Sequence, residues 1–307
     1  MLFLRYILVK WGYKMYRNIF LTCTLGVLAA CNHNQVDHNV KPPTASNGYA
    51  TETSSFDDPG VTRTTKVELQ NLDWDGTGNV TQKQVSLDIS ATENVDEYIV
   101  TYEGIDVTIN WNEVDGWFEG QTGDMYIRIS PWWITDNQQA GLSWINIWDY
   151  SGVEGDSWGF AVSGYNSDPA DVAARTGEVL FSGWGGISLA AVDDSFWAFA
   201  DGPASLAADF DLNTISGTIE LSDCGCGDYV ISDTTMYLNE MEIAGNTFDG
   251  QATVTPADLG LASVGNISVD GMFYEFGATA AGGTVSGTGV AAEGFTTTLI
   301  NGAFIAE

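Results

Sequence analysis

Hydrophobic and polar positions alternate in short runs after residue 60, and no apolar pattern with the period of a helix is sustained there. The runs are rich in β-branched and aromatic residues, and Gly, Asp and Asn separate them, as turns separate strands. We expect strands at residues 85–89, 98–102, 107–111, 125–129 and 144–148. Turn signals at a spacing of about 8–12 residues are typical of a sandwich or a barrel. The pattern predicts an all-β protein.

The composition changes near residue 165 and divides the β region into two predicted domains. Residues 61–168 are rich in tryptophan, and we expect a β-rich, handle-like domain there. Residues 169–307 are rich in Gly, Ala and Thr, and only residues 169–174 look helical. Consecutive strands with short turns predict an eight-stranded antiparallel up-and-down β-barrel, which leaves no sheet edge exposed. Eight or nine strands can be drawn, at 176–183, 186–200, 204–212, 215–222, 228–240, 243–254, 263–276, 281–289 and 295–306.

The first 30 residues have the pattern of a signal peptide. Lys14 and Arg17 precede an apolar run of about a dozen residues, which is too short to span a membrane. The run ends in Leu28, Ala29, Ala30 and Cys31, which resembles a bacterial lipobox, so we expect translation to start at Met1 or Met15 and Cys31 to carry the lipid. Asn32 after the cysteine favours the outer membrane over the inner one. An ordinary secretory signal with an incidental cysteine is the alternative.

Residues 31–60 are polar and unpatterned. Such a segment cannot bury enough apolar area to offset the entropy of ordering it, so we expect a flexible tether. The lipid on Cys31 would then be the only contact with the membrane, and the protein would be lipid-anchored in the outer membrane at the cell surface.

The charge excludes nucleic acid as a partner. The chain has 41 Asp+Glu against 10 Lys+Arg, and no Lys or Arg follows Arg175. A nucleic-acid binder needs a basic track. Both histidines, His33 and His38, lie in the predicted tether, so the folded part has none for a Ser-His-Asp arrangement. We therefore expect a protein that is not an enzyme, with no catalytic residue and no cofactor.

Two features are candidates for chemistry or metal binding. Cys224 and Cys226 are two thiols in an exported protein, and we expect them to form a disulfide; a thiolate metal site and redox activity stay open. Residues 73–79 resemble a calcium loop faintly, but Gln84 stands where the bidentate glutamate belongs. We predict no metal site.

A tryptophan cluster is the strongest candidate for recognition. Because strand residues alternate between faces, Trp144, Asn146 and Trp148 share one face, and Ile145 and Ile147 the other, where they suit a core. We predict that the tryptophans contact a partner, and the alternative is that they are buried or cover a barrel mouth. The candidate residues are Trp132, Trp133, Trp144 and Trp148.

Short motifs in the second half resemble the barrel of transferrin-binding protein B. Residues 177–183 (GEVLFSG) look like its opening strand, and 207–219 (AADFDLNTISGTI) look like its "ADF…GT" hairpin. Residues 243–250 (IAGNTFDG), 271–274 (GMFY) and 302–304 (GAF) resemble later landmarks, in the same order. The chain departs from the family at Glu275–Phe276, where the family has Gly-Pro, and at Ala280, where it has glutamate.

The resemblance to surface lipoproteins of the transferrin-binding and factor-H-binding kind implies capture of cargo or a partner, linked to nutrient or iron acquisition. It implies an unknown protein or glycan ligand and a TonB-dependent transporter as partners. A glycan-binding or adhesive module, and a structural envelope lipoprotein without a soluble ligand, are the alternatives.

Overall fold

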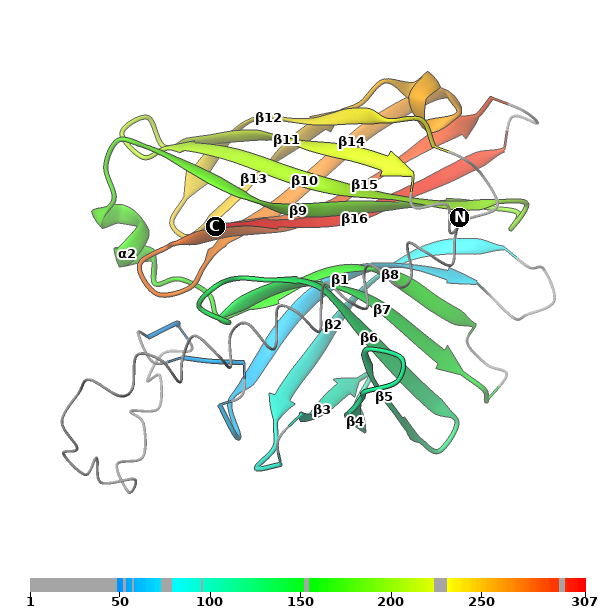
Figure 1. Cartoon of the computed structure of the whole chain (residues 1–307). Coiled ribbons are helices and arrows are strands. Elements are labelled where there is room, and N and C mark those ends of the chain that lie inside the picture. Colours follow the sequence, from blue (N-terminus) through cyan, green and yellow to red (C-terminus); the bar gives the residue numbers. More distant parts are fainter. Residues whose placement is uncertain are drawn as a thin grey trace, which may run out of the picture. The chain divides into compact units, whose positions relative to one another are not determined.

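The computed structural model describes residues 49–51, 54–56, 58–72, 79–94, 96–151, 155–223, 231–292 and 296–307, without the side chains of Lys66 and Glu68. Residues Ala45–Glu307 form one compact unit. Within it, two closed antiparallel barrels follow each other along the chain (Figure 1). The first contains β1 (Thr62–Leu72), β2 (Val80–Ala91), β3 (Glu97–Tyr102), β4 (Ile105–Asn112), β5 (Trp117–Thr122), β6 (Met125–Ile134), β7 (Ala140–Asp149) and β8 (Asp156–Gly164).

The second barrel has the predicted eight-stranded up-and-down topology. A short helix, α2 (Pro169–Ala174), precedes it, with Asp168 as N-cap. Its strands are β9 (Glu178–Ala191), β10 (Trp197–Asp209), β11 (Thr214–Asp223), β12 (Thr234–Ala244), β13 (Thr247–Thr253), β14 (Leu261–Tyr274), β15 (Ala280–Ala291) and β16 (Thr297–Ala306), with the 3-10 turn η1 (Pro256–Leu259) before β14. Each strand pairs with the next, and β16 closes on β9. The prediction of an all-β chain ending in such a barrel is confirmed.

The predicted handle-like region closes into a barrel of its own. All five strands expected there lie within β2, β3, β4, β6 and β7. Closure depends on β1 and β8, which pair only from Gln70 to Leu72 with Trp158 to Asp156. Because such pairing joins residues far apart in sequence, strand patterns alone do not reveal it.

Two strands replace three predicted ones at the start of the second barrel. We expected turns near residues 184–185 and 201–203, but β9 and β10 run straight through both. A glycine beside the first expected turn and one within the second are needed inside the strands: a Cβ on Gly183 would lie 2.1 Å from Ile305 O, and one on Gly202 would lie 1.8 Å from Glu220 O. Close backbone approach, and not chain reversal, is the reason for glycine at these positions.

The two barrels share an apolar joint and a buried amide contact. Phe160 and Leu142 of the first barrel pack with Ala303 and Ile305 of the second. Gln70 is fully buried, and its Nε2 donates to the main-chain oxygens of Ser188 and Leu299, each at 3.2 Å. This polar contact fixes where β1 lies against β9 and β16.

Part of the predicted tether is docked onto the fold. Ala50 N donates to Asn166 O at 2.8 Å, and Gln139 Nε2 donates to Thr51 O at 3.1 Å. Buried Arg63 donates to the main-chain oxygen of Phe56 at 2.8 Å and lies over the Phe56 ring. The expectation of a tether reaching residue 60 is therefore wrong for the described residues from Tyr49 onward, because these side chains satisfy its backbone.

Several predicted features lie outside the described residues: the signal peptide, Cys31, both histidines, residues 73–78 of the calcium-like loop, and Cys224 with Cys226. Among the residues that are described, no helix is both long and apolar enough to cross a membrane.

Candidate protein-binding face

The outer face of β5, β6 and β7 presents aromatic side chains because these strands alternate. Ile127 and Ile147 point into the first barrel, where they are 0 % and 2 % exposed. Their neighbours Tyr126, Arg128 and Trp148 therefore point outward and are half-buried. The predicted division of β7 into a core face of isoleucines and an outer face of tryptophans is confirmed.

The strand register places charged and polar groups of this face side by side. Glu119 of β5 is directly opposite Arg128 of β6, and Arg128 is opposite Asn146 of β7. Asn146 is in turn opposite Trp158 of β8. Residues directly opposite each other are close enough for their side chains to interact.

Arg128 is held between two indole rings. Its guanidinium carbon lies 4.7 Å from the ring centroid of Trp117 and 4.9 Å from that of Trp148. Nη2 donates to Asn146 Oδ1 at 3.2 Å, and the same oxygen accepts from Trp144 Nε1 at 2.9 Å. Stacking on both sides fixes the plane of the guanidinium.

Glu119 accepts hydrogen bonds from three side chains of this face. Its carboxylate accepts from Tyr126 OH at 2.5 Å, from Trp117 Nε1 at 2.7 Å and from Asn112 Nδ2 at 2.7 Å. The Tyr126 and Trp117 hydrogen bonds lower the pKa of Glu119, so it stays ionised near neutral pH. Burial, with the Glu119 contact, raises the pKa of Tyr126 to about 12, so Tyr126 remains a donor.

We call Trp117, Glu119, Tyr126, Arg128, Asn146 and Trp148 the Arg128 ladder. Hydrogen bonds and ring stacking lock their rotamers, so little side-chain entropy remains to be lost when a partner binds. Trp, Tyr and Arg are also the side chains that dominate protein–protein hot spots.

The structure separates the four predicted tryptophans. Trp148 belongs to the Arg128 ladder, and Trp144 adjoins it through Asn146. Trp144 also packs edge-on against Phe160 and against Phe199 of the second barrel, with ring centroids 4.9 and 4.3 Å apart.

The remaining two tryptophans lie at the joint between the barrels. Trp132 packs on Phe160 at 4.9 Å and is 37 % exposed, while half-buried Trp133 packs into the joint itself. The four side chains therefore do not form one continuous platform.

Trp117, Glu119 and Arg128 were missed as candidates. The alternation of residues 125–129 places Tyr126 and Arg128 on one face, which is a signal that the sequence carries. Trp117 and Glu119 reach them only through the β5–β6 register, which no local pattern reveals.

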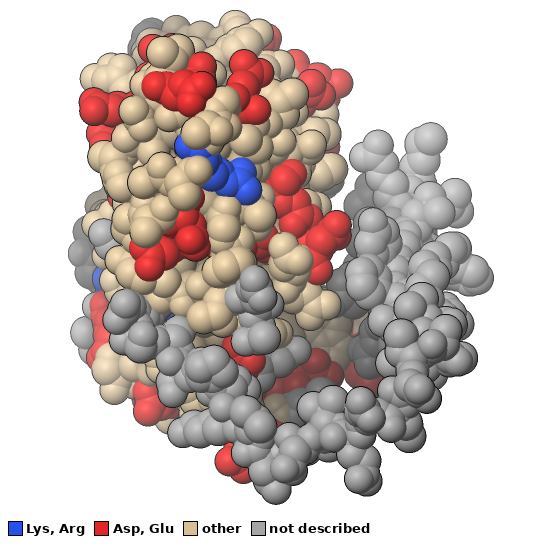
Figure 2. Space-filling view, turned by 90° about the vertical axis from the view of Figure 1, so that its left-hand side faces the viewer, with Lys and Arg blue, Asp and Glu red and all other residues tan. Residues whose placement is uncertain are grey.

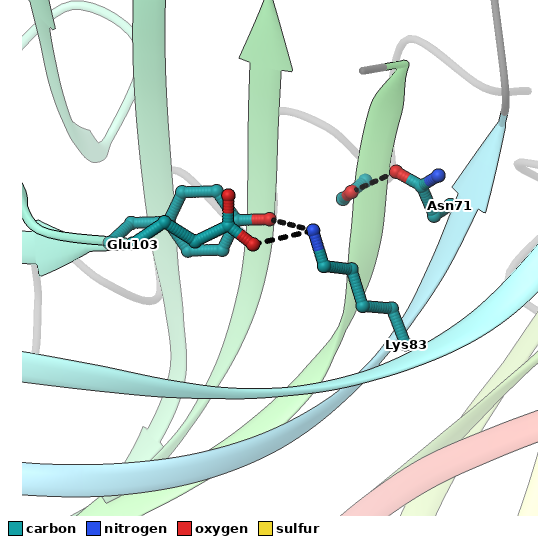
Figure 3. A network of polar contacts seen from close by, with 5 residues as sticks. Asn71, Lys83 and Glu103 are labelled. Carbon is teal, nitrogen blue, oxygen red and sulfur yellow. Dashed lines mark hydrogen bonds and ion pairs between the residues drawn. The ribbon is translucent and has the colours of Figure 1, made fainter. Parts of the chain in front are cut away.

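A second set of polar contacts lies in the first barrel, between β2 and the end of β3 and between β1 and β8 (Figure 3). Lys83 Nζ lies 2.6 Å from Glu103 Oε1 and donates to Tyr102 OH at 3.1 Å. Ser157 Oγ donates to Asn71 Oδ1 at 2.6 Å. Since Lys83 and Glu103 are partly exposed, their ion pair contributes little to stability.

The acidic character of the chain is visible on its surface. Figure 2 shows one face with several Asp and Glu patches around a small Lys/Arg patch. In the second barrel, exposed Asp249 is directly opposite both Glu242 and Asp270. Within the described ranges, no group of three or more His, Cys, Asp or Glu side chains could hold a metal ion.

No protein-family model and no curated protein sequence matches the chain. Among solved structures, it is similar to transferrin-binding protein B of Neisseria meningitidis, at 17 % identity and a TM-score of 0.46, over 79 % of this chain and 43 % of that one. Transferrin-binding protein B of Haemophilus parasuis is similar at 14 % identity and a TM-score of 0.46, over 80 % of this chain and 45 % of that one.

A shorter protein also matches: HpuA of Kingella denitrificans, solved in complex with human haemoglobin, at 13 % identity and a TM-score of 0.35, over 85 % and 92 % of the two chains. The chain spans less than half the length of the transferrin-binding proteins named above. At these identities and TM-scores the likeness concerns the fold alone.

Proposed function

We propose that this chain is a non-catalytic binding protein that captures a protein partner through the outer face of its first barrel, in the service of nutrient or iron acquisition. We further propose that a lipid on Cys31 anchors it in the outer membrane at the cell surface, beside a TonB-dependent transporter. The observation that carries the binding proposal is the pre-organised Arg128 ladder.

Both barrel interiors are filled by side chains, which supports binding of a ligand on an outer face. Leu69, Tyr102 and Ile127 fill the first barrel, and Phe248 and Phe273 fill the second, each no more than 1 % exposed. Eight-stranded barrels are just wide enough to be filled by side chains in this way. A ligand is therefore expected on an outer face.

The geometry of the ladder favours a protein over a glycan. Sugars stack on open aromatic faces, but Arg128 already covers one face of Trp117 and one of Trp148. A glycan partner predicts that small saccharides change tryptophan fluorescence, whereas protein capture predicts no such change.

The first test is capture by the full chain in detergent. The names of the neighbouring structures supply the probes: transferrin and haemoglobin. We expect one of these, or a protein from host fluid, to bind, and Trp148→Ala to weaken binding by about 30-fold, as loss of a hot spot does.

Tyr237→Ala is the matched control, since Tyr237 is a 55 % exposed aromatic residue on β12 of the second barrel. Equal losses in the two variants would contradict the proposed face. Protease shaving of intact cells tests the location: digestion is expected, and full protection until the outer membrane is opened would overturn surface display.

A further inference from the structure

Two glutamates of the second barrel hold the β6–β7 turn of the first. Both carboxylate oxygens of Glu307 accept from Asp136 N, each at 2.9 Å. Glu275 Oε2 accepts from Asn137 Nδ2 at 3.2 Å. The turn is thus attached to the second barrel largely through carboxylate acceptors.

These glutamates lie in a poor environment for negative charge. Glu275 is fully buried, and within the described part of the chain its Oε1 has no hydrogen-bond partner, while Oε2 also accepts from Thr279 Oγ1 at 2.6 Å. Burial raises the pKa of Glu307 to about 7, opposed by the Asp136 N–H and reinforced by the charges of Asp136 and Glu275.

Other groups packed against the site do not provide a direct counter-charge. Asp171 of α2 accepts from Gly277 N at 3.3 Å, and Arg175 Nε donates to Gly277 O at 2.8 Å. From β9, the main chain of Ser182 pairs with that of Glu307. Among the described contacts, Arg175 therefore binds the turn beside Glu275 and not the carboxylates themselves.

We propose that Glu307 and the β6–β7 turn, which buried Glu275 also holds, form a proton-dependent latch between the two barrels, closed while Glu307 carries a proton and loosened when it is ionised. The sign follows from linkage. An acid whose pKa is raised in the closed arrangement favours that arrangement at low pH, and the gain is lost as the pH rises through the raised pKa. The latch does not depend on which partner the protein binds.

Amide hydrogen exchange of the full chain at pH 6 and pH 8, corrected for the intrinsic rates, tests the latch. In the wild type we expect protection of residues 136–139 and 275–278 to fall by about tenfold at the higher pH, as an opening linked to one proton allows. Glu307→Gln should give equal protection at both values. Glu242→Gln, at an exposed position of β12, is the matched control and should behave like the wild type.

Two results would overturn the latch: equal wild-type protection at both pH values, or a pH-dependent loss that persists in Glu307→Gln. If Glu307→Gln fails to fold, Asp136→Asn decides the question, because it removes a neighbouring charge and keeps the N–H that binds Glu307. It should reduce the loss of protection at pH 8, and a loss as large as that of the wild type would contradict the proposal.

Discussion

Phe160 of the first barrel rests on Gly186 of the second, so closely that a Cβ at position 186 would lie 2.5 Å from the Cζ of the ring. Phe160 is completely buried, and the rings of Trp132 and Trp144 pack edge-on against it. The absence of a side chain at one position thus lets one barrel seat on the other.

Gly186→Ala should loosen the joint between the barrels. The added methyl group overpacks the ring, and we expect a loss of about 1–3 kcal/mol in the free energy of unfolding, measured by urea denaturation. Phe160→Ala should cost about 3–5 kcal/mol. Because the two residues share one contact, the double variant should lose less than the sum of the single losses.

The control for this double-mutant cycle is Gly265→Ala, where the nearest atom to an added Cβ would be Thr288 O at 3.3 Å. Its loss should be clearly smaller than that of Gly186→Ala. If the losses in unfolding free energy of the two single variants simply add in the double variant, the contact between Gly186 and Phe160 does not stabilise the joint.

Arg128→Ala should destabilise the first barrel. The change removes two ring contacts of about 0.5–1 kcal/mol each, so we expect about 1–2 kcal/mol in all. Arg128→Lys should recover only part of this, because an ammonium group lacks the planar shape that stacks between Trp117 and Trp148.

Urea denaturation again provides the measurement, and Glu103→Gln is the comparison, since loss of its partly exposed ion pair should cost less than about 1 kcal/mol. A stability of Arg128→Ala equal to that of the wild type would mean that the stacking contributes nothing to the fold.

Gln70→Glu should open the joint in a pH-dependent way. The amide donates to two main-chain oxygens in a buried position, and an ionised carboxylate can donate to neither. We expect a loss of about 3–5 kcal/mol at neutral pH, as for an unpaired buried charge. The loss should shrink at acidic pH, where the introduced carboxyl gains a proton and can donate.

Scanning calorimetry at pH 5 and pH 8 measures this difference. Gln251→Glu, at an exposed position of β13 opposite Ser268, should change the unfolding temperature little at either pH. Equal losses for Gln70→Glu at both pH values would indicate that the donor is not needed.

Asp249→Thr should stabilise the second barrel. Asp249 faces a carboxylate on each side, and directly opposed like charges cost about 0.2–1 kcal/mol per pair. The gain should be largest at low ionic strength and decline in high salt, where the repulsion is screened. Asp211→Thr, at an exposed turn position outside this row, should give no comparable gain. A gain that does not depend on salt would point to strand propensity and not to charge.

The sequence predicts the strands of this fold, which depend on local patterns, but not the contacts between strands that are distant in the chain. Alternation located the strands and the inward Ile145 and Ile147, because that period is a property of a single strand. The predicted turn directly after Gly183 was wrong, since only the neighbouring backbone reveals why a side chain is excluded there.

The candidate site shows the same division. A register shift between Pro131 and Trp133 breaks the alternation of β6, so both adjacent tryptophans, Trp132 and Trp133, reach the joint. The pairing of Glu119 with Arg128 depends on register and was equally beyond a single-strand pattern.

The docked segment before β1 determines how the molecule bears mechanical load. A pull on the chain upstream of Tyr49 reaches Asn166 and Gln139 first, and only later the start of β1. Tyr49 pairs in parallel with Asn166, which lies between the last strand of one barrel and the first of the other. Under tension, the described residues between Tyr49 and Asp58 should detach as a separate early event while both barrels stay closed. The force would then reach the strands of the first barrel only after these contacts have broken.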